Sequence, residues 1–200
     1  MQIELKKLEK YIDIYDIFRI LKKENNKKIA FLDSSLKNKY GRYSIIGIDP
    51  YLELKENNKK FYINDVLSEE NFEEYLAKFL KENKQENDSL LPLISGGIVY
   101  FSYDYGRKFE NIATRHKKDL DIPEAIVTFY KTYIVEDIEK QEIYISYQDK
   151  KDYDNLINLL EKTNLEKENL VKKNSLANFK SNFEKEEYLK AIKSTIDYII

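Results

Sequence analysis

The order in which strand-like and helix-like segments follow one another constrains the fold of this chain more than any other feature. Short apolar or alternating runs predict strands at residues 29–32, 42–48, 51–55, 60–63, 96–103, 125–137 and 142–147. Apolar side chains at helical spacing predict helices over residues 12–21, 69–81 and 151–162. Because the two kinds of segment do not alternate regularly, the sequence predicts an α+β fold of mainly antiparallel sheets with flanking helices, and not a doubly wound fold.

Proline, asparagine and glycine predict three local features of these strands. Asp49-Pro50 is expected to end the strand that precedes it, because proline cannot donate a hydrogen bond to a strand ladder. The alternating runs on either side of Glu56 predict a hairpin with Asn57-Asn58 at its solvated tip. Gly96-Gly97 opens a run that we predict to be a buried strand, with the glycines allowing a turn or close packing.

A polar and poorly patterned stretch divides the chain near its carboxy-terminal end. We assign residues 1–166 to one domain, 167–180 to a linker, and 181–200 to the first helix of a second, truncated domain. Ser181 and Glu184 have the spacing of a capping box, which begins a helix. The apolar stripe of this helix consists of Tyr188, Leu189, Ile192, Ile196 and Ile199. No glycine, proline or basic last turn ends the helix, so we expect the sequence to stop at the entrance to a domain that covers the stripe.

Composition argues against several classes of function. The 34 Lys and Arg residues nearly balance the 36 Asp and Glu residues, and a net charge of −2 gives no sustained field for a nucleic acid or an anionic membrane. The absence of Cys excludes a thiolate metal site and a cysteine nucleophile, and the single histidine, His116, lies in a polar context without a nucleophile pattern. We assign His116 no role and expect no metal site. No apolar stretch suits a secretory signal or a membrane span, so we expect a cytoplasmic protein.

Polar side chains interrupt two apolar runs and are candidates for a binding site. Asp33 and Ser34 follow the first run, while Arg42 and Ser44 interrupt the second. Buried charged or hydroxyl groups need partners, because burial without a hydrogen bond is costly. If the two strands are neighbours, the arginine and serines could bind the carboxylate of a zwitterionic ligand, and Asp33 its ammonium group. The alternative, which the residues alone favour, is an internal Arg–Asp pair capped by the serines.

A second polar cluster, Tyr103 to Glu110, follows directly from a predicted strand and indicates a structured corner. Arg107 could pair with Asp104 or Glu110 and fix this corner internally, or it could receive an anionic partner. The sequence favours the structural role. We identify no catalytic constellation in the chain.

Four segments together carry a further signal. They are Phe31-Leu32-Asp33-Ser34, the run from Gly41-Arg42-Tyr43-Ser44 to Asp49-Pro50, the run from Gly96-Gly97 to Phe109-Glu110, and Ser181-Asn182-Phe183 with the Glu-Glu-Tyr that follows. In order and spacing they resemble the amino-terminal domain shared by component I of anthranilate synthase and of aminodeoxychorismate (para-aminobenzoate) synthase. The resemblance covers most of the chain. It implies that this part packs with a larger carboxy-terminal part into one two-lobed α+β sandwich.

The resemblance also implies what the whole enzyme does. Asp104-Tyr105-Gly106-Arg107 is more similar to the aminodeoxychorismate branch, and Phe31-Leu32-Asp33-Ser34 departs from the Leu-Leu-Glu-Ser usual in anthranilate synthases. We therefore expect part of an enzyme that replaces the C4 hydroxyl of chorismate with ammonia from a glutaminase subunit (component II), giving 4-amino-4-deoxychorismate on the folate path. The resemblance places the chorismate-binding residues and the Mg²⁺ ligands of the whole enzyme outside this sequence, so we expect the fragment to be inactive.

A tryptophan pocket is the one ligand site that the resemblance places in this sequence. The matching residues are Leu32, Asp33, Ser34, Arg42, Tyr43 and Ser44. Asp33 stands where anthranilate synthases usually carry Glu, which shortens the carboxylate by one methylene. Two further hypotheses remain open. The enzyme could be anthranilate synthase component I, a lyase that also eliminates pyruvate, or the chain could be a stand-alone tryptophan-sensing module.

Overall fold

The computed structural model of the chain describes residues 3–24, 28–36, 38, 40–110, 120–162 and 180–199. Its internal contacts divide the chain into two units, Met1–Leu165 and Glu166–Ile200. His116 and most of the predicted linker, residues 167–179, lie outside the described residues. The elements of the first unit, in chain order, are β1 (Glu4–Lys7), α1 (Ile14–Glu24), β2 (Ala30–Leu32), β3 (Tyr43–Asn57), β4 (Lys60–Ile63), β5 (Val66–Ser68), α2 (Phe72–Glu82), β6 (Gly97–Phe101), a 3₁₀ helix (Tyr103–Lys108), β7 (Ala125–Asp137), β8 (Glu142–Tyr147) and α3 (Lys150–Lys162).

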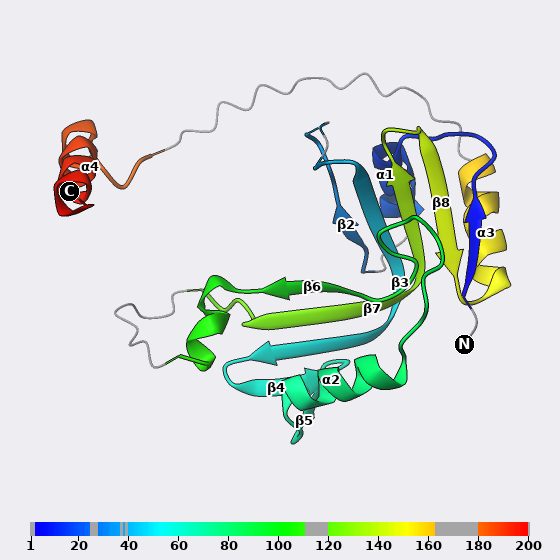
Figure 1. The fold of residues 1–200 in the computed structure, drawn as a ribbon, viewed down its shortest axis with the longest axis horizontal. Coiled ribbons are helices and arrows are strands. Elements are labelled where there is room, and N and C mark those ends of the chain that lie inside the picture. The colour runs from blue at the N-terminus through cyan, green and yellow to red at the C-terminus, as the bar shows by residue number, and fades with distance from the viewer. Residues whose placement is uncertain are drawn as a thin grey trace. The chain divides into compact units, whose positions relative to one another are not determined.

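An antiparallel sheet built around two long strands, β3 and β7, forms the first unit (Figure 1). The strand order is β1-β8-β7-β3-β4-β5, with β2 added to β3 and β6 added to β7. β3 and β7 pair with each other from Tyr43↔Asp137 to Glu56↔Ala125, and each takes different neighbours at its two ends. One half of the sheet therefore contains β1, β8 and β2, and the other contains β4, β5 and β6. An antiparallel sheet with flanking helices confirms the predicted α+β class.

Each half of the sheet has its own hydrophobic core. In the first core, α1 and α3 pack their apolar stripes, including Ile17 and Leu156, against the half that contains β8. In the second core, α2 packs against the other half, with the Phe72 ring 5.5 Å from that of Phe61 and the Phe79 ring 4.7 Å from that of Phe129. Full burial of such a side chain contributes about 1.5–3 kcal/mol, which is why the helical stripes decide where the helices lie.

The helix and hairpin predictions are largely confirmed. The three helices predicted in the first unit are present, with α1 running on to Glu24 and α2 beginning at Phe72. Asn71 caps α2, because its side chain accepts a hydrogen bond from the Glu74 amide at 3.0 Å. The hairpin between β3 and β4 turns at Asn58 and Lys59, whose φ angles of 50° and 61° suit a tight two-residue turn. The tip therefore lies one residue beyond its predicted position.

The predicted strand break at Asp49-Pro50 is wrong, because β3 continues through both residues. Asp49 adopts a positive φ of 57°, and the register with β7 shifts between Pro50 and Leu52. Pro50 has no backbone N–H to donate to the ladder, and the bulge accommodates it without ending the strand. Just before it, Gly47 allows a close approach, since a Cβ there would lie 2.7 Å from the Tyr130 ring.

The strand predicted at residues 96–103 is present as β6, but the prediction that it is buried is wrong. β6 ends at Phe101, and its side chains at Val99, Tyr100 and Phe101 are between 43% and 54% exposed. Within the described residues β6 pairs with β7 alone, so it is an edge strand. An apolar run by itself does not distinguish a central strand from an edge strand. β1 and β5 were not predicted, because both are short and β1 is mostly charged.

The second unit contains one described helix, α4 (Lys185–Ile199), whose predicted apolar stripe is present. The predicted capping box is wrong in detail, because α4 begins after Glu184 and not after Ser181. The Ser181 hydroxyl accepts a hydrogen bond from the Phe183 amide at 3.1 Å, and the Glu187 carboxylate accepts one from the Glu184 amide at 3.3 Å. A serine that satisfies an amide two residues ahead forms a turn before the helix. Across the described residues, no helix is long and apolar enough to cross a membrane.

Candidate functional site

The two polar segments that sequence analysis singled out lie side by side. β2 pairs antiparallel with β3 up to Leu32↔Ile45, and Ser34 lies just beyond this pair, next to Tyr43 and Ser44. The Ser34 hydroxyl donates to the Tyr43 carbonyl at 2.6 Å, and the Ser34 amide donates to the Ser44 hydroxyl at 3.1 Å. The structure thus brings Ser34, Tyr43 and Ser44 together, and the two serines tie β2 to β3 where the regular ladder ends.

Arg42 forms an internal pair, but its partner comes from a distant part of the chain. Its Nε and Nη2 donate to the two carboxylate oxygens of Asp137 at 3.1 and 2.7 Å, in a bidentate arrangement. Glu139 lies 3.3 Å away, and the guanidinium carbon lies 4.9 Å from the centre of the Tyr43 ring. The Asp137 side chain is only 2% exposed. The hydrogen bond from Arg42 holds the pKa of Asp137 below its ordinary value, so the carboxylate is charged at neutral pH.

The six predicted residues therefore differ in what they could offer a ligand. Leu32 is 51% exposed and Asp33 is also exposed, so both side chains are accessible. Tyr43 is half-buried under the Arg42 guanidinium. Ser44 is buried, and its hydroxyl already accepts one hydrogen bond, while that of Ser34 is committed to a carbonyl. The cluster is a hydrogen-bonded rim, with Leu32 and Asp33 on its accessible side.

A buried carboxylate that was not predicted from the sequence lies next to this rim. Glu136 pairs with Ser44 across the β3–β7 ladder and is only 4% exposed. The Tyr11 hydroxyl donates to its Oε1 at 2.6 Å, from the segment that leads into α1. Burial and this hydrogen bond raise the pKa of Tyr11, so the phenol stays protonated and remains a donor. The signal that could have revealed this partnership is a Glu within the apolar run Ile134-Val135-Glu136.

The predicted corner is present as the 3₁₀ helix Tyr103–Lys108, which we call the corner. Arg107 pairs with Asp104 at 2.7 Å, so its predicted structural role is supported. The corner is fastened to the sheet by Lys108, which lies 2.7 Å from both Glu56 on β3 and Glu73 on α2. No local sequence pattern predicts this three-way contact.

Tyr105 completes the fastening of the corner. Its hydroxyl donates to Glu73 Oε1 at 2.6 Å, and its ring lies 4.7 Å from that of Phe101. Burial opposes the charge on Glu73, yet hydrogen bonds from Lys108 and Tyr105 outweigh it and hold the Glu73 pKa below its ordinary value. Burial likewise opposes the charge on Lys108, but its two carboxylate partners raise its pKa. The ion pairs therefore persist at neutral pH.

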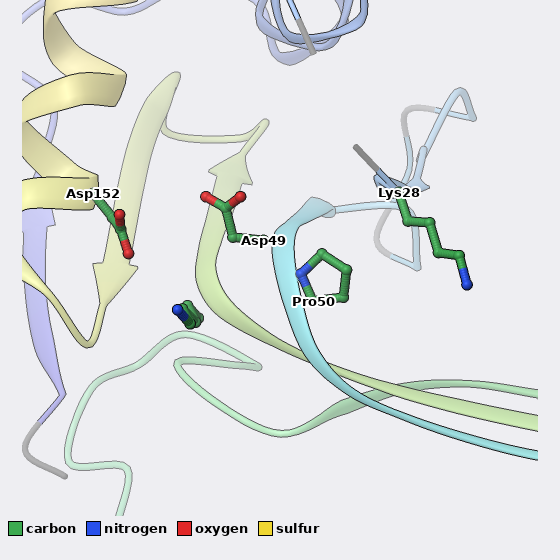
Figure 2. A pocket seen from close by; sticks show the side chains of 5 residues that line it. Lys28, Asp49, Pro50 and Asp152 are labelled. Atoms are coloured by element: carbon green, nitrogen blue, oxygen red, sulfur yellow. The ribbon is translucent and has the colours of Figure 1, made fainter. Parts of the chain in front are cut away.

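A hollow of about 360 Å³ lies at the bulge of β3 and is lined by Lys28, Asp49, Pro50, Lys131 and Asp152 (Figure 2). None of the six predicted residues lines it. Among the described residues, no group of three or more His, Cys, Asp or Glu side chains is placed to hold a metal ion.

Comparison with known proteins identifies the family. Residues 13–200, nearly the whole chain, match the family of chorismate binding enzymes. The chain belongs to this family. It is 31% identical over 146 residues to anthranilate synthase component 1 of Acetivibrio thermocellus, which covers 69% of this chain and 30% of that protein. It is 25% identical over 147 residues to anthranilate synthase component 1 of Bacillus subtilis, covering 67% of this chain and 28% of that protein.

A shorter similarity connects this chorismate-binding family member to the second branch. It is 33% identical to aminodeoxychorismate synthase component 1 of Klebsiella aerogenes, but over 60 residues, which are 30% of this chain and 13% of that protein. Its fold is similar to that of anthranilate synthase component I from Streptococcus pneumoniae, with a TM-score of 0.52 and 21% identity over 70% of this chain and 33% of that one. The chain thus spans about a third or less of the length of the relatives it matches.

Proposed function

We propose that this chain is the amino-terminal part of component I of a chorismate-using synthase, and that the enzyme is of the anthranilate synthase kind. The observation that carries the choice of branch is the extent of similarity. Two anthranilate synthases align with more than two thirds of the chain, whereas the aminodeoxychorismate synthase aligns with 30% of it. Anthranilate synthase is therefore better supported than aminodeoxychorismate synthase, which the sequence motifs favoured.

In this proposal the whole enzyme converts chorismate to anthranilate, with ammonia as the nitrogen source and pyruvate as the second product. The name "component 1", carried by the relatives, supports a second component, for which we propose a glutaminase subunit. We propose that Mg²⁺ and the catalytic residues act in a part of the polypeptide outside the 200 residues. In this proposal the chain contributes the amino-terminal sheet.

A product assay on a polypeptide that contains this sequence together with the rest of component I tests the proposal. Chorismate, Mg²⁺ and ammonium chloride are supplied, anthranilate is followed by its fluorescence, and pyruvate by coupled reduction to lactate. We expect equal amounts of anthranilate and pyruvate. Formation of 4-amino-4-deoxychorismate without pyruvate would instead assign the enzyme to the folate branch, and the 200-residue chain alone should form neither product.

We further propose that the rim formed by Leu32, Asp33, Ser34, Arg42, Tyr43 and Ser44 borders a tryptophan-like pocket. The neighbouring positions of these residues support this proposal, with the accessible Asp33 carboxylate suited to an ammonium group. Calorimetric titration of the chain with L-tryptophan, beside the variant Asp33→Ala, tests it. We expect saturable binding that the variant weakens. Tight binding of L-tryptophan by the isolated chain would favour the sensing module. Heat changes that Asp33→Ala leaves unaffected would exclude the rim as the binding site.

A further inference from the structure

The hollow at the bulge of β3 brings together charged side chains from four separate segments. Asp49 and Pro50 lie at the bulge, and Lys131 stands on β7 between the pairs Ile48↔Thr132 and Pro50↔Tyr130. Asp152 reaches the hollow from the first turn of α3, and Lys28 from the residues before β2. The bulge matters because it re-aims the Asp49 side chain, which points toward the side of the hollow occupied by Asp152 in Figure 2.

Two of these charged side chains, Lys28 and Asp49, already interact with other groups of the chain. Lys28 donates to both carboxylate oxygens of Glu53, at 3.1 and 2.9 Å, and its side chain extends away from Asp49 in Figure 2. By contrast, within the described parts of the chain, the side chains of Lys131 and Asp152 make neither an ion pair nor a hydrogen bond. These opposite charges line the same hollow without meeting, which leaves a gap between them that a third group can bridge.

We propose that this hollow is a binding site for a small zwitterion, a molecule that carries an ammonium group and a carboxylate on a short carbon chain. The ammonium group pairs with Asp152, the carboxylate pairs with Lys131, and the carbon chain lies against Pro50. Lys131 and Asp152 contribute one ammonium group and one carboxylate, so a simple anion or a simple cation is attracted by one of them and repelled by the other. A zwitterion satisfies both signs of charge.

This site is distinct from the rim of the proposed tryptophan-like pocket. Asp49 lies five positions beyond Ser44 on β3, which corresponds to about 17 Å at ~3.3 Å per residue, and the two sets of residues do not overlap. The inference therefore does not depend on the proposed enzymatic function.

Titration of the ¹⁵N-labelled chain with zwitterions of increasing length tests the inference. Glycine, β-alanine and 4-aminobutyrate vary the separation of the two charges, while methylammonium and acetate at equal ionic strength are single-charge controls. A small ligand in an open site suggests a Kd on the order of 1–10 mM. We expect saturable shifts of the amide signals of Asp49, Lys131 and Asp152 for one zwitterion in the series, and none that saturate for either control.

Substitutions distinguish a built site from a general ionic effect. Lys131→Met and Asp152→Asn each remove one charged contact and should weaken the best zwitterion about tenfold. Lys151→Met is the matched control, because Lys151 is exposed on α3 next to Asp152 and does not line the hollow. Shifts that do not saturate, shifts reproduced by acetate or methylammonium, or equal binding by all three variants would each overturn the inference.

Discussion

Replacing Lys108 by Met should destabilise the first unit more than loss of an ordinary surface ion pair. Lys108 lies 2.7 Å from both Glu56 and Glu73, and the Glu56 side chain is only 8% exposed. Removing one partner of a fully buried pair costs about 3–5 kcal/mol, and losing an exposed pair costs up to about 1 kcal/mol. Because the Lys108 side chain is 37% exposed, water can reach the carboxylates that remain. We therefore expect a loss of about 2 kcal/mol, between these limits.

Urea unfolding at neutral pH, followed by circular dichroism, measures this loss. The matched control is Lys150→Met, which removes a contact of 3.8 Å between the exposed side chains of Lys150 and Asp154 and should cost less than about 0.5 kcal/mol. Combining Lys108→Met with Glu56→Gln should cost less than the sum of the single changes, because the neutral amide no longer leaves a buried charge unpaired. Equal stability of Lys108→Met and Lys150→Met, or strict additivity in the double variant, would refute the three-way contact.

Three further predictions concern the other half of the sheet and the bulge. Tyr11→Phe leaves the buried Glu136 carboxylate without its phenol donor and should cost about 1–3 kcal/mol in urea unfolding; a cost below about 0.5 kcal/mol would contradict this hydrogen bond. Gly47→Ala places a Cβ 2.7 Å from the Tyr130 ring and should lower stability by about 1–3 kcal/mol, whereas an unchanged thermal midpoint would show that the ring moves freely. The lowered pKa of Asp137 adds stability that is complete above pH 3.8, its ordinary value, and is lost as the pH falls through the folded value, so Asp137→Asn should flatten the acid limb of a stability-against-pH curve; an unchanged acid limb would contradict it.

Local pattern was sufficient to predict the helices and the strands β7 and β8, and it singled out the polar segments around Ser34 and Ser44. These features depend on the spacing of apolar and polar residues along the chain, whereas the pairing of β2 with β3 came from the structure. The local pattern failed at Asp49-Pro50. There β3 pairs with β7 on both sides of the proline, and a bulge accommodates the proline within the strand. The local pattern also misjudged β6, because burial of a strand depends on which elements cover it.

Residue pattern alone specifies the α+β class, the position of most elements and the polar segments that form the rim. The pairing of charges that are far apart in the sequence follows from the three-dimensional packing. Arg42 pairs with Asp137, 95 positions away, and Lys108 with Glu56, 52 positions away. Apolar periodicity reports which face of an element is buried, but an ion pair depends on sheet register and on where a distant chain segment crosses the sheet. Those depend on the packing of the whole unit, and no local pattern specifies them.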